Sequence, residues 1–263
     1  MSAPHSILIV RLGAMGDILH AMPAVAALRK ALPDAHFGWL AEKRWAELLH
    51  DAADVAHTAD TRRWRRSPIS QSTGSEFREA LREIRERGYD VAIDFQGAVK
   101  SAVFARLSRA PRRFGFERPL EWPASLFYTN GTSTAAAHVV DRNFDLGSAA
   151  AGVLGVELDR KCEAPLPGDP AADSAADEKL KQIGIYGPFA ILNPGAGWGA
   201  KQWPAGRHAK VARALGEGGI RSLVNFGPGE ETLAKIVGEQ AGGYAIASRF
   251  SISELIAITR RAS

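Results

Sequence analysis

The chain has 263 residues, of which 46% are hydrophobic and 24% are charged, with a formal net charge of +4 at pH 7. These proportions match a globular protein with one large or two ordinary domains and a sizeable core. No apolar stretch is long enough to span a bilayer. Cys162 is the only cysteine, which excludes an internal disulfide framework and a cysteine-ligated zinc site and is typical of a reducing cytoplasm.

Strand-like and helix-like segments alternate along the whole chain, which predicts an α/β fold with parallel sheets covered by helices. Strands are predicted at residues 6–11, 36–40, 90–95 and 113–116, and then at 189–193, 220–226 and 243–247. Helices are predicted at residues 17–31, 44–50, 76–87, 99–107, 139–153, 175–183, 205–217, 230–240 and 252–261.

A segment rich in proline, residues 163–173, has little apolar mass and is the predicted linker between two domains. The expected domains are 1–165 and 166–263, with a cleft between them. Only three strands are predicted after the linker, and the last helix runs into Arg260 and Arg261 where another strand should follow. The pattern therefore predicts that the second domain is incomplete.

The most informative segment is the first strand–turn–helix unit. Residues 7–10 form an apolar run that suits a strand buried on both faces. Gly13 and Gly16 permit a tight turn, and Asp17 follows where the turn becomes a helix. Open α/β sheets bind ligands in this crevice, so Asp17 can either cap the helix or remove a proton from a substrate.

Polar residues also follow the strand at 90–95, where Gln96 and Lys100 are expected to face the same crevice as Asp17. The alternative is a strand-end cap with a surface lysine. Basic residues are concentrated at 62–66, four cations in five residues, and recur as Arg106, Arg109, Arg112, Arg113 and Arg118. They favour partners with phosphate or carboxylate groups, and no motif supports nucleic-acid binding.

A second strand–turn–helix unit contains Gly195, Gly197, Gly199 and then Lys201. Its backbone N–H groups and the lysine can bind a phosphate, or the segment is a plain connecting loop with a solvated lysine. It is not a P-loop, because no Gly-Lys-Ser/Thr follows the glycines. In the third unit Glu230 and Glu231 begin a helix, where they can complement the helix dipole or accept hydrogen bonds from a ribose.

Taken together, the chain resembles glycosyltransferase family 9, and within it the heptosyltransferase I group. The resemblance lies in segments that occur in order over nearly the whole chain: residues 16–20 with Pro23, 62–65, 77–81, 89–101, 124–128, 138–142 and 201–204. It implies a GT-B fold, in which two Rossmann-like domains face each other across a cleft. It also implies Kdo-lipid A as the acceptor, ADP-L-glycero-β-D-manno-heptose as the donor, and no further cofactor.

The resemblance also implies roles for particular residues. Asp17 would be the catalytic base, with inversion at the anomeric carbon, and Lys201 and Glu231 would contact the donor's diphosphate and ribose, beside Gly195 and Gly197. The implied acceptor-binding residues are Arg62, Arg63, Arg65, Gln96, Lys100 and His138. No acidic cluster has the spacing of a metal site, so the expected reaction is metal-independent. The expected location is the cytoplasm, with peripheral contact to the anionic inner face of the inner membrane.

Two departures from the family pattern leave alternatives open. The family's Asp-Thr-Gly-x-x-His motif is not found before residue 263, so the chain could be a fragment that binds acceptor without turning it over. The spacing around Arg118 also differs, so no role is carried over to it. Another family 9 enzyme, such as heptosyltransferase II, is the nearest rival. A nicotinamide-dependent dehydrogenase is disfavoured because Gly13-Ala-Met-Gly16 is not Gly-x-Gly-x-x-Gly.

Overall fold

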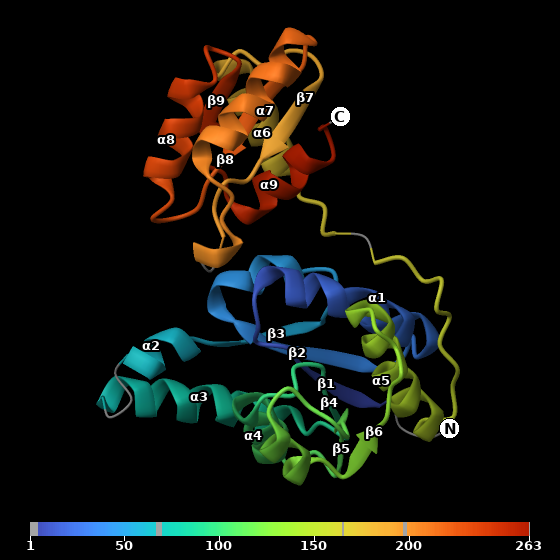
Figure 1. Ribbon diagram of the computed structural model, residues 1–263. Coiled ribbons are helices and arrows are strands. Elements are labelled where there is room, and N and C mark those ends of the chain that lie inside the picture. Colours follow the sequence, from blue (N-terminus) through green and yellow to red (C-terminus); the bar gives the residue numbers. More distant parts are fainter. Residues whose placement is uncertain (1–4, 67–69, 165, 197–198, 263) are drawn as a thin grey trace. The chain divides into compact units, whose positions relative to one another are not determined.

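The computed structural model describes residues 5–66, 70–164, 166–196 and 199–262. The chain divides into two compact units, Met1–Leu166 and Pro167–Ser263 (Figure 1). The division falls beside the boundary that the proline-rich segment predicts.

Six parallel strands form the sheet of the first unit, in the order β3-β2-β1-β4-β5-β6. The strands are β1 (Ser6–Val10), β2 (His36–Glu42), β3 (Val55–Ala59), β4 (Val91–Asp94), β5 (Arg112–Phe116) and β6 (Asn130–Thr132). This is the strand order of dinucleotide-binding folds, in which the direction of winding reverses between β1 and β4. A ligand crevice is therefore expected at the carboxyl ends of these two strands.

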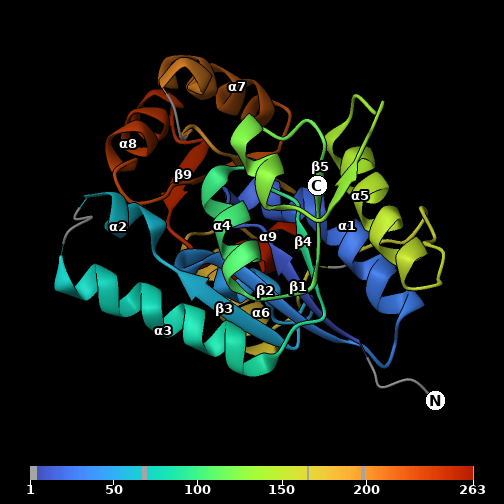
Figure 2. The same ribbon diagram turned by 90° about the horizontal axis from the view of Figure 1, so that it is seen from below.

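Helices cover both faces of this sheet. They are α1 (Met15–Ala31), α2 (Thr61–Arg66), α3 (Gln71–Arg87), α4 (Val99–Leu107) and α5 (Val139–Val153), with 3-10 helices η1 (Lys43–Leu49) and η2 (Trp122–Phe127). α1 and α5 pack together on one face, and α3 and α4 lie on the other (Figures 1 and 2). All four residues of the apolar run Ile7, Leu8, Ile9 and Val10 are fully buried, as a strand covered on both faces requires.

The second unit has three parallel strands in the order β7-β8-β9. They are β7 (Phe189–Leu192), β8 (Arg221–Asn225) and β9 (Ala245–Ser248), and the helices are α6 (Pro170–Gln182), η3 (Gly199–Lys201), α7 (Ala205–Glu217), α8 (Glu231–Gln240) and α9 (Ile252–Thr259). α6 packs with α9, and α7 packs with α8. The two helix pairs enclose separate apolar clusters, one around Leu223 and one around Val224, because neighbouring residues of β8 point to opposite faces.

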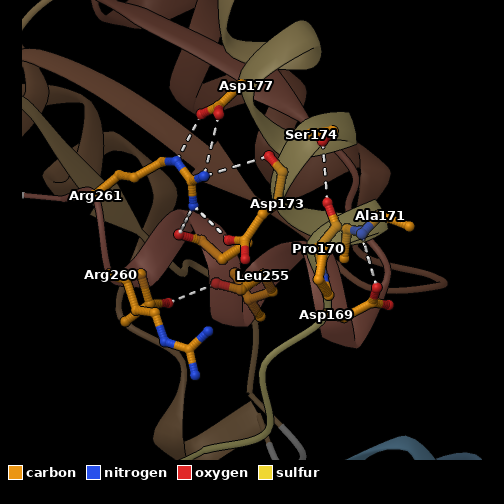
Figure 3. Close-up of polar contacts among 12 residues, drawn as sticks. Asp169, Pro170, Ala171, Asp173, Ser174, Asp177, Leu255, Arg260 and Arg261 are labelled. Atoms are coloured by element: carbon orange, nitrogen blue, oxygen red, sulfur yellow. Dashed lines mark hydrogen bonds and ion pairs between the residues drawn. The ribbon is translucent and has the colours of Figure 1, made fainter.

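An arginine fork joins α9 to α6 (Figure 3). Arg261 places Nε 2.6 Å from Oδ1 of Asp177 and Nη1 2.9 Å from Oδ1 of Asp173, and it also donates to the carbonyl of Ala257. Hydrogen bonds to the two carboxylates raise the pKa of Arg261. A second ion pair, Lys179 with Glu254 at 2.7 Å, lies on the same pair of helices. Helix docking in this unit thus combines apolar burial with charge pairing.

The structure departs from the predicted elements at several places. The edge strands β3 and β6 and the six-residue helix α2 were not predicted, because their sequences, VAHTA, NGT and TRRWRR, each contain at most one large apolar residue. The predicted linker is shorter than expected, since α6 begins at Pro170. Asp169 caps that helix by accepting from the backbone N–H groups of Ala171 and Ala172. The segment expected to be an α-helix at 44–50 is the 3-10 helix η1.

No helix within the described ranges has both the length and the apolar character needed to cross a bilayer.

A buried histidine makes the stability of the first unit depend on pH. His57 is 2% exposed, and its Nε2 lies 2.7 Å from the hydroxyl of Tyr89. Burial lowers the pKa of His57 to about 4, with smaller contributions from Arg87 and His36. Glu83 lies 3.9 Å from Nδ1 but is half exposed. Folded His57 therefore stays neutral at pH values where an unfolded histidine takes up a proton.

Because the unfolded chain binds more protons below pH 6.5, stability falls as the pH falls from 6.5 towards 4. We expect burial of neutral His57 to lower the free energy of unfolding by about 2 kcal/mol when the pH falls from 7.5 to 5.0. Urea denaturation at the two pH values measures this difference in the free energy of unfolding. In His57→Gln the difference between the two pH values should be smaller by about 2 kcal/mol, because glutamine does not titrate. Equal pH dependence in both proteins would contradict the assignment.

Candidate functional site

The turn between β1 and α1 holds Asp17 in the first turn of the helix. Its Oδ2 accepts a hydrogen bond from the backbone N–H of Ala14 at 3.3 Å, so the side chain caps the helix from within its first turn. The side chain is nevertheless 47% exposed. A Cβ at Gly13 would lie 2.6 Å from Oδ2, so glycine at position 13 makes room for this carboxylate. The capping contact thus leaves an accessible carboxylate at the crevice.

Arg11 fixes the position of this carboxylate. Its side chain is 9% exposed, with Nη2 3.2 Å from Oδ1 of Asp17 and Nη1 donating to the carbonyl of Phe95. Burial lowers the pKa of Arg11, and the charges of Asp17 and Asp94 oppose that change. A planar guanidinium can hold a carboxylate and a carbonyl at once. Arg11 therefore links the end of β4 to the first turn of α1.

Asp94, at the end of β4, is fully buried and holds the turn into α4. Its carboxylate accepts from the N–H groups of Gln96 and Gly97 at 2.9 and 3.2 Å. It also accepts from the hydroxyls of Ser101 at 2.8 Å and Tyr128 at 2.7 Å. Burial raises the pKa of Asp94, and these four hydrogen bonds oppose the rise. A buried carboxylate with four donors fixes the course of the loop around it.

Gln96 connects the two loops. Its Oε1 accepts from the backbone N–H groups of Leu12 at 2.8 Å and Gly13 at 3.1 Å. Sequence reasoning placed Gln96 in acceptor binding. Gln96 does lie in the crevice, but its side-chain oxygen is hydrogen-bonded to the β1–α1 turn.

A pocket of about 560 Å³ opens at this crevice. It contains one carboxylate and three arginines, so it favours anionic ligands. Its lining residues are Arg11, Asp17, Phe95, Gln96, Phe116, Arg118, Pro119, Leu120, Val139, Arg142 and Asn143. Arg142 lies over the ring of Phe116, with 5.2 Å from the guanidinium carbon to the ring centroid.

Among the polar lining residues, sequence reasoning missed Arg11, Arg142 and Asn143 and assigned no role to Arg118. Arg11 was missed although it is a cation directly after a fully apolar strand, which is a usable signal. Arg142 and Asn143 come from the start of α5, a helix whose packing beside α1 cannot be read from spacing. Asn143 is held there by donating to the carbonyl of His20 at 2.8 Å.

Among the described side chains, Lys100, Arg63 and His138 were also predicted to bind the acceptor, and they are not among the residues that line this pocket. Lys100 has Nζ 3.0 Å from Oγ1 of Thr61 and 4.0 Å from Oε1 of Glu42. It therefore does not share the Asp17 pocket, in contrast to what was expected. The basic run lies on α2, where Arg63 pairs with Glu76 at 2.5 Å.

The side chains of Arg62 and Arg65 fall outside the described part of the structure. His138 is exposed and caps α5 by accepting from the N–H of Val140 at 3.3 Å. It makes an edge contact with the ring of His20, 6.4 Å between ring centroids.

In the second unit, polar groups gather where β7 and β8 end. Asn225 donates to the side chain of Asn193 at 2.9 Å. Glu230 accepts from the N–H of Gly227 at 2.8 Å, and its carboxylate lies so close to Gly195 that a Cβ there would be 2.0 Å from Cδ. Glu230, the first of the two carboxylates expected at this helix start, thus contacts the glycine loop.

The remaining predicted donor residues are more open. Glu231 is exposed at the first position of α8, and Lys201 is exposed at the end of η3. Gly197 lies outside the described residues.

Comparisons with known proteins agree with this architecture. The model of "Glycosyltransferase family 9 (heptosyltransferase)" matches residues 77–263. Lipopolysaccharide heptosyltransferase 1 of Salmonella typhimurium is 28% identical over 95% of this chain and 77% of its own length. The Escherichia coli K12 protein of the same name is 30% identical over 89% of this chain and 72% of its own length.

Solved structures are similar over nearly the whole chain. E. coli heptosyltransferase WaaC with ADP-2-deoxy-2-fluoro heptose has 28% identity and a TM-score of 0.77, covering 98% of this chain and 80% of that one. A family 9 glycosyltransferase from Veillonella parvula, at 22% identity, has a TM-score of 0.82 and covers 99% of this chain and 74% of that one. The second likeness shows the fold alone.

The fold is that of the GT-B heptosyltransferases, and the protein is an enzyme that transfers a sugar. The chain belongs to glycosyltransferase family 9.

The role given to Arg11 can be tested by shortening its reach while keeping its charge. In Arg11→Lys one ammonium cannot hold Asp17 and the carbonyl of Phe95 together, so we expect turnover to fall about tenfold with little change in the KM for donor. Arg29→Lys is the matched control, since Arg29 makes a similar fork on Asp54, at 3.0 and 3.2 Å, away from the pocket. Steady-state kinetics measure both, and an Arg11→Lys enzyme as active as the control would contradict the role.

Proposed function

We propose that this protein transfers L-glycero-D-manno-heptose from ADP-heptose to the Kdo sugar of Kdo-lipid A. Heptosyl transfer in lipopolysaccharide core synthesis is supported by the relatives named heptosyltransferase 1 and by the WaaC structures. The Kdo-lipid A acceptor is what the resemblance to the heptosyltransferase I group implies, and the pocket of the first unit supports it. The observation that carries it is a single accessible carboxylate, Asp17, among three arginines at the topological switch point.

The acceptor fits the charge of this pocket. Kdo carries a carboxylate and lipid A carries phosphates, and guanidinium groups bind both in paired hydrogen bonds. Arg118 and Arg142 line the pocket with Asp17, whereas Arg11 already forms an ion pair with Asp17. We therefore assign the acceptor's anionic groups to Arg118 and Arg142 and its reacting hydroxyl to Asp17.

Asp17 would act as general base in an inverting reaction. The Kdo hydroxyl oxygen attacks the anomeric carbon and its proton passes to the carboxylate, while the bond from that carbon to the diphosphate oxygen breaks and ADP leaves with the electron pair. A carboxylate is a weak base for an alcohol, so the proton moves late, as the new bond forms. A diphosphate is a good leaving group, so the paired carboxylates of a glycosidase are not needed.

The donor belongs to the second unit in this proposal. Lys201 and the N–H groups of the loop with Gly195 and Gly197 would stabilise charge on the departing diphosphate. Glu231, or its neighbour Glu230, would bind the ribose. Lys201 and these N–H donors would stabilise the diphosphate without a metal, so we propose a metal-independent reaction without a further cofactor. Because the proposed acceptor is lipid-linked, we also propose that the enzyme works in peripheral contact with the cytoplasmic face of the inner membrane.

The direct test is an assay with purified Kdo-lipid A and ADP-heptose, followed by mass spectrometry. We expect one added heptose, formed equally well in the presence of EDTA. Transfer only to an acceptor that already carries a heptose would instead indicate heptosyltransferase II activity. A protein that binds acceptor but forms no product would be a non-catalytic fragment, and the proposal would be wrong.

Asp17→Asn tests the base. The amide keeps the size of the side chain but cannot take a proton, so turnover should fall about a thousandfold while ADP binding by calorimetry is unchanged. Asp34→Asn, an exposed aspartate in the loop before β2, serves as the control. Turnover of Asp17→Asn near that of the control would remove Asp17 from the mechanism.

Lys201→Ala tests the donor site separately. Loss of one cation from a diphosphate should weaken ADP binding about tenfold and leave binding of an acyl-free Kdo acceptor unchanged. Lys210→Ala, an exposed lysine on α7, is the control. Unaltered ADP affinity in Lys201→Ala would place the diphosphate elsewhere.

A further inference from the structure

Three large apolar side chains stand out from the first unit within seven residues of sequence. Leu120 is 80% exposed, Trp122 is 72% exposed and Leu126 is 73% exposed. They lie on η2 and the turn before it, and we call them the η2 patch. A cluster of exposed large apolar residues on one short segment is typical of an interaction surface.

The backbone beneath the η2 patch is held in place. The N–H of Glu121 donates to the carbonyl of Gly97 at 3.0 Å, and the Glu121 carboxylate accepts from the N–H of Val99 at 2.7 Å. Ala124 is fully buried, and η2 packs along α4. The three side chains therefore project from an anchored segment, and folding of the unit leaves them exposed.

Cations lie around the patch. Arg118 is exposed just before it, and Arg106, Arg109 and Arg112 are exposed at the end of α4 and the start of β5. Arg113 donates to the carbonyl of Phe127, the last residue of η2, at 2.8 Å, which places this basic region beside the helix. Two acidic residues lie nearby: Glu117 is exposed beside Arg118, and Glu121 lies between Leu120 and Trp122, with its carboxylate capping α4.

Apolar side chains with a tryptophan among them, flanked by arginines, have the chemistry of a surface that enters the interface of an anionic bilayer. The aromatic ring suits the headgroup level, and the arginines suit the phosphates. We propose that the η2 patch inserts into the interfacial layer of a membrane that contains anionic phospholipids.

The patch also reaches the pocket, because Leu120 lines the cavity that contains Asp17. Insertion would bring the mouth of that cavity to the depth of a lipid-anchored headgroup. This link to the acceptor rests on the proposed function, whereas insertion itself does not.

Flotation with vesicles of phosphatidylethanolamine and phosphatidylglycerol tests insertion. We expect the Trp122→Ser/Leu126→Ser variant to bind at least about tenfold more weakly than the unaltered protein, because two apolar side chains no longer leave water. Val153→Ser/Tyr186→Ser, which alters residues 47% and 82% exposed elsewhere, should bind as the unaltered protein does. Quenching by brominated lipid should also fall in Trp122→Phe.

Further measurements separate failure of this proposal from failure of the proposed function. Circular dichroism establishes that the variants fold. On an acyl-free, water-soluble Kdo acceptor, Trp122→Ser/Leu126→Ser should keep full activity, while on acceptor in vesicles it should lose activity with binding. Equal vesicle binding by this variant and by the control would overturn insertion. Insertion would also be overturned if light scattering showed that the unaltered protein is a dimer and that Trp122→Ser/Leu126→Ser is a monomer. That result would assign the patch to contact with a second copy of the chain. No transfer to either acceptor by any protein would count against the function alone.

Discussion

The buried carboxylate of Asp94 is the constraint on which the candidate site depends. It lies at the end of β4 without solvent, and two hydroxyls and two backbone N–H groups compensate its burial. Loss of a donor to a buried polar group lowers the free energy of unfolding by about 1–3 kcal/mol. The loop after β4, which supplies these donors, therefore has little freedom to take another path. Gln96 is thereby held where its oxygen meets the N–H groups of Leu12 and Gly13.

The fixed position of Gln96 in turn constrains the charged groups of the site. Gln96 fixes the β1–α1 turn, and Arg11 bridges from the carbonyl of Phe95 to Asp17. Two loops that are 84 residues apart in sequence are thus joined twice, by an amide and by a guanidinium. The carboxylate at the end of this series is oriented without being buried, which is the state that a general base requires.

Much of this fold could be predicted from the sequence. The buried strand 7–10, the helices at 99–107, 139–153 and 205–217, and the break near residue 165 follow from apolar period and proline content. Asp17 was identified because glycines and a polar residue follow an apolar strand. The edge strands β3 and β6 and helix α2 were not predicted, because each has at most one large apolar residue and so shows no apolar run or period.

The limits for the site are physical as well. Arg142 and Asn143 reach the pocket only because α5 packs beside α1, and this contact depends on tertiary structure. Lys100 sits on the helix that follows Gln96, yet its side chain meets Thr61 and Glu42 at the end of β2. Glu230 and Glu231 are adjacent in sequence, but it is Glu230 that accepts from the N–H of Gly227 and lies against Gly195, and this difference cannot be read from spacing.

The central claim is that the joined loops of β1 and β4 present Asp17 to a sugar hydroxyl in a cationic pocket. The most direct measurement is a crystal structure of the protein with an acyl-free Kdo disaccharide. The account predicts a Kdo hydroxyl about 2.6–3.2 Å from the carboxylate of Asp17, with the sugar's carboxylate on Arg118 or Arg142. A disaccharide bound outside this pocket, or one whose hydroxyls all face away from Asp17, would contradict it.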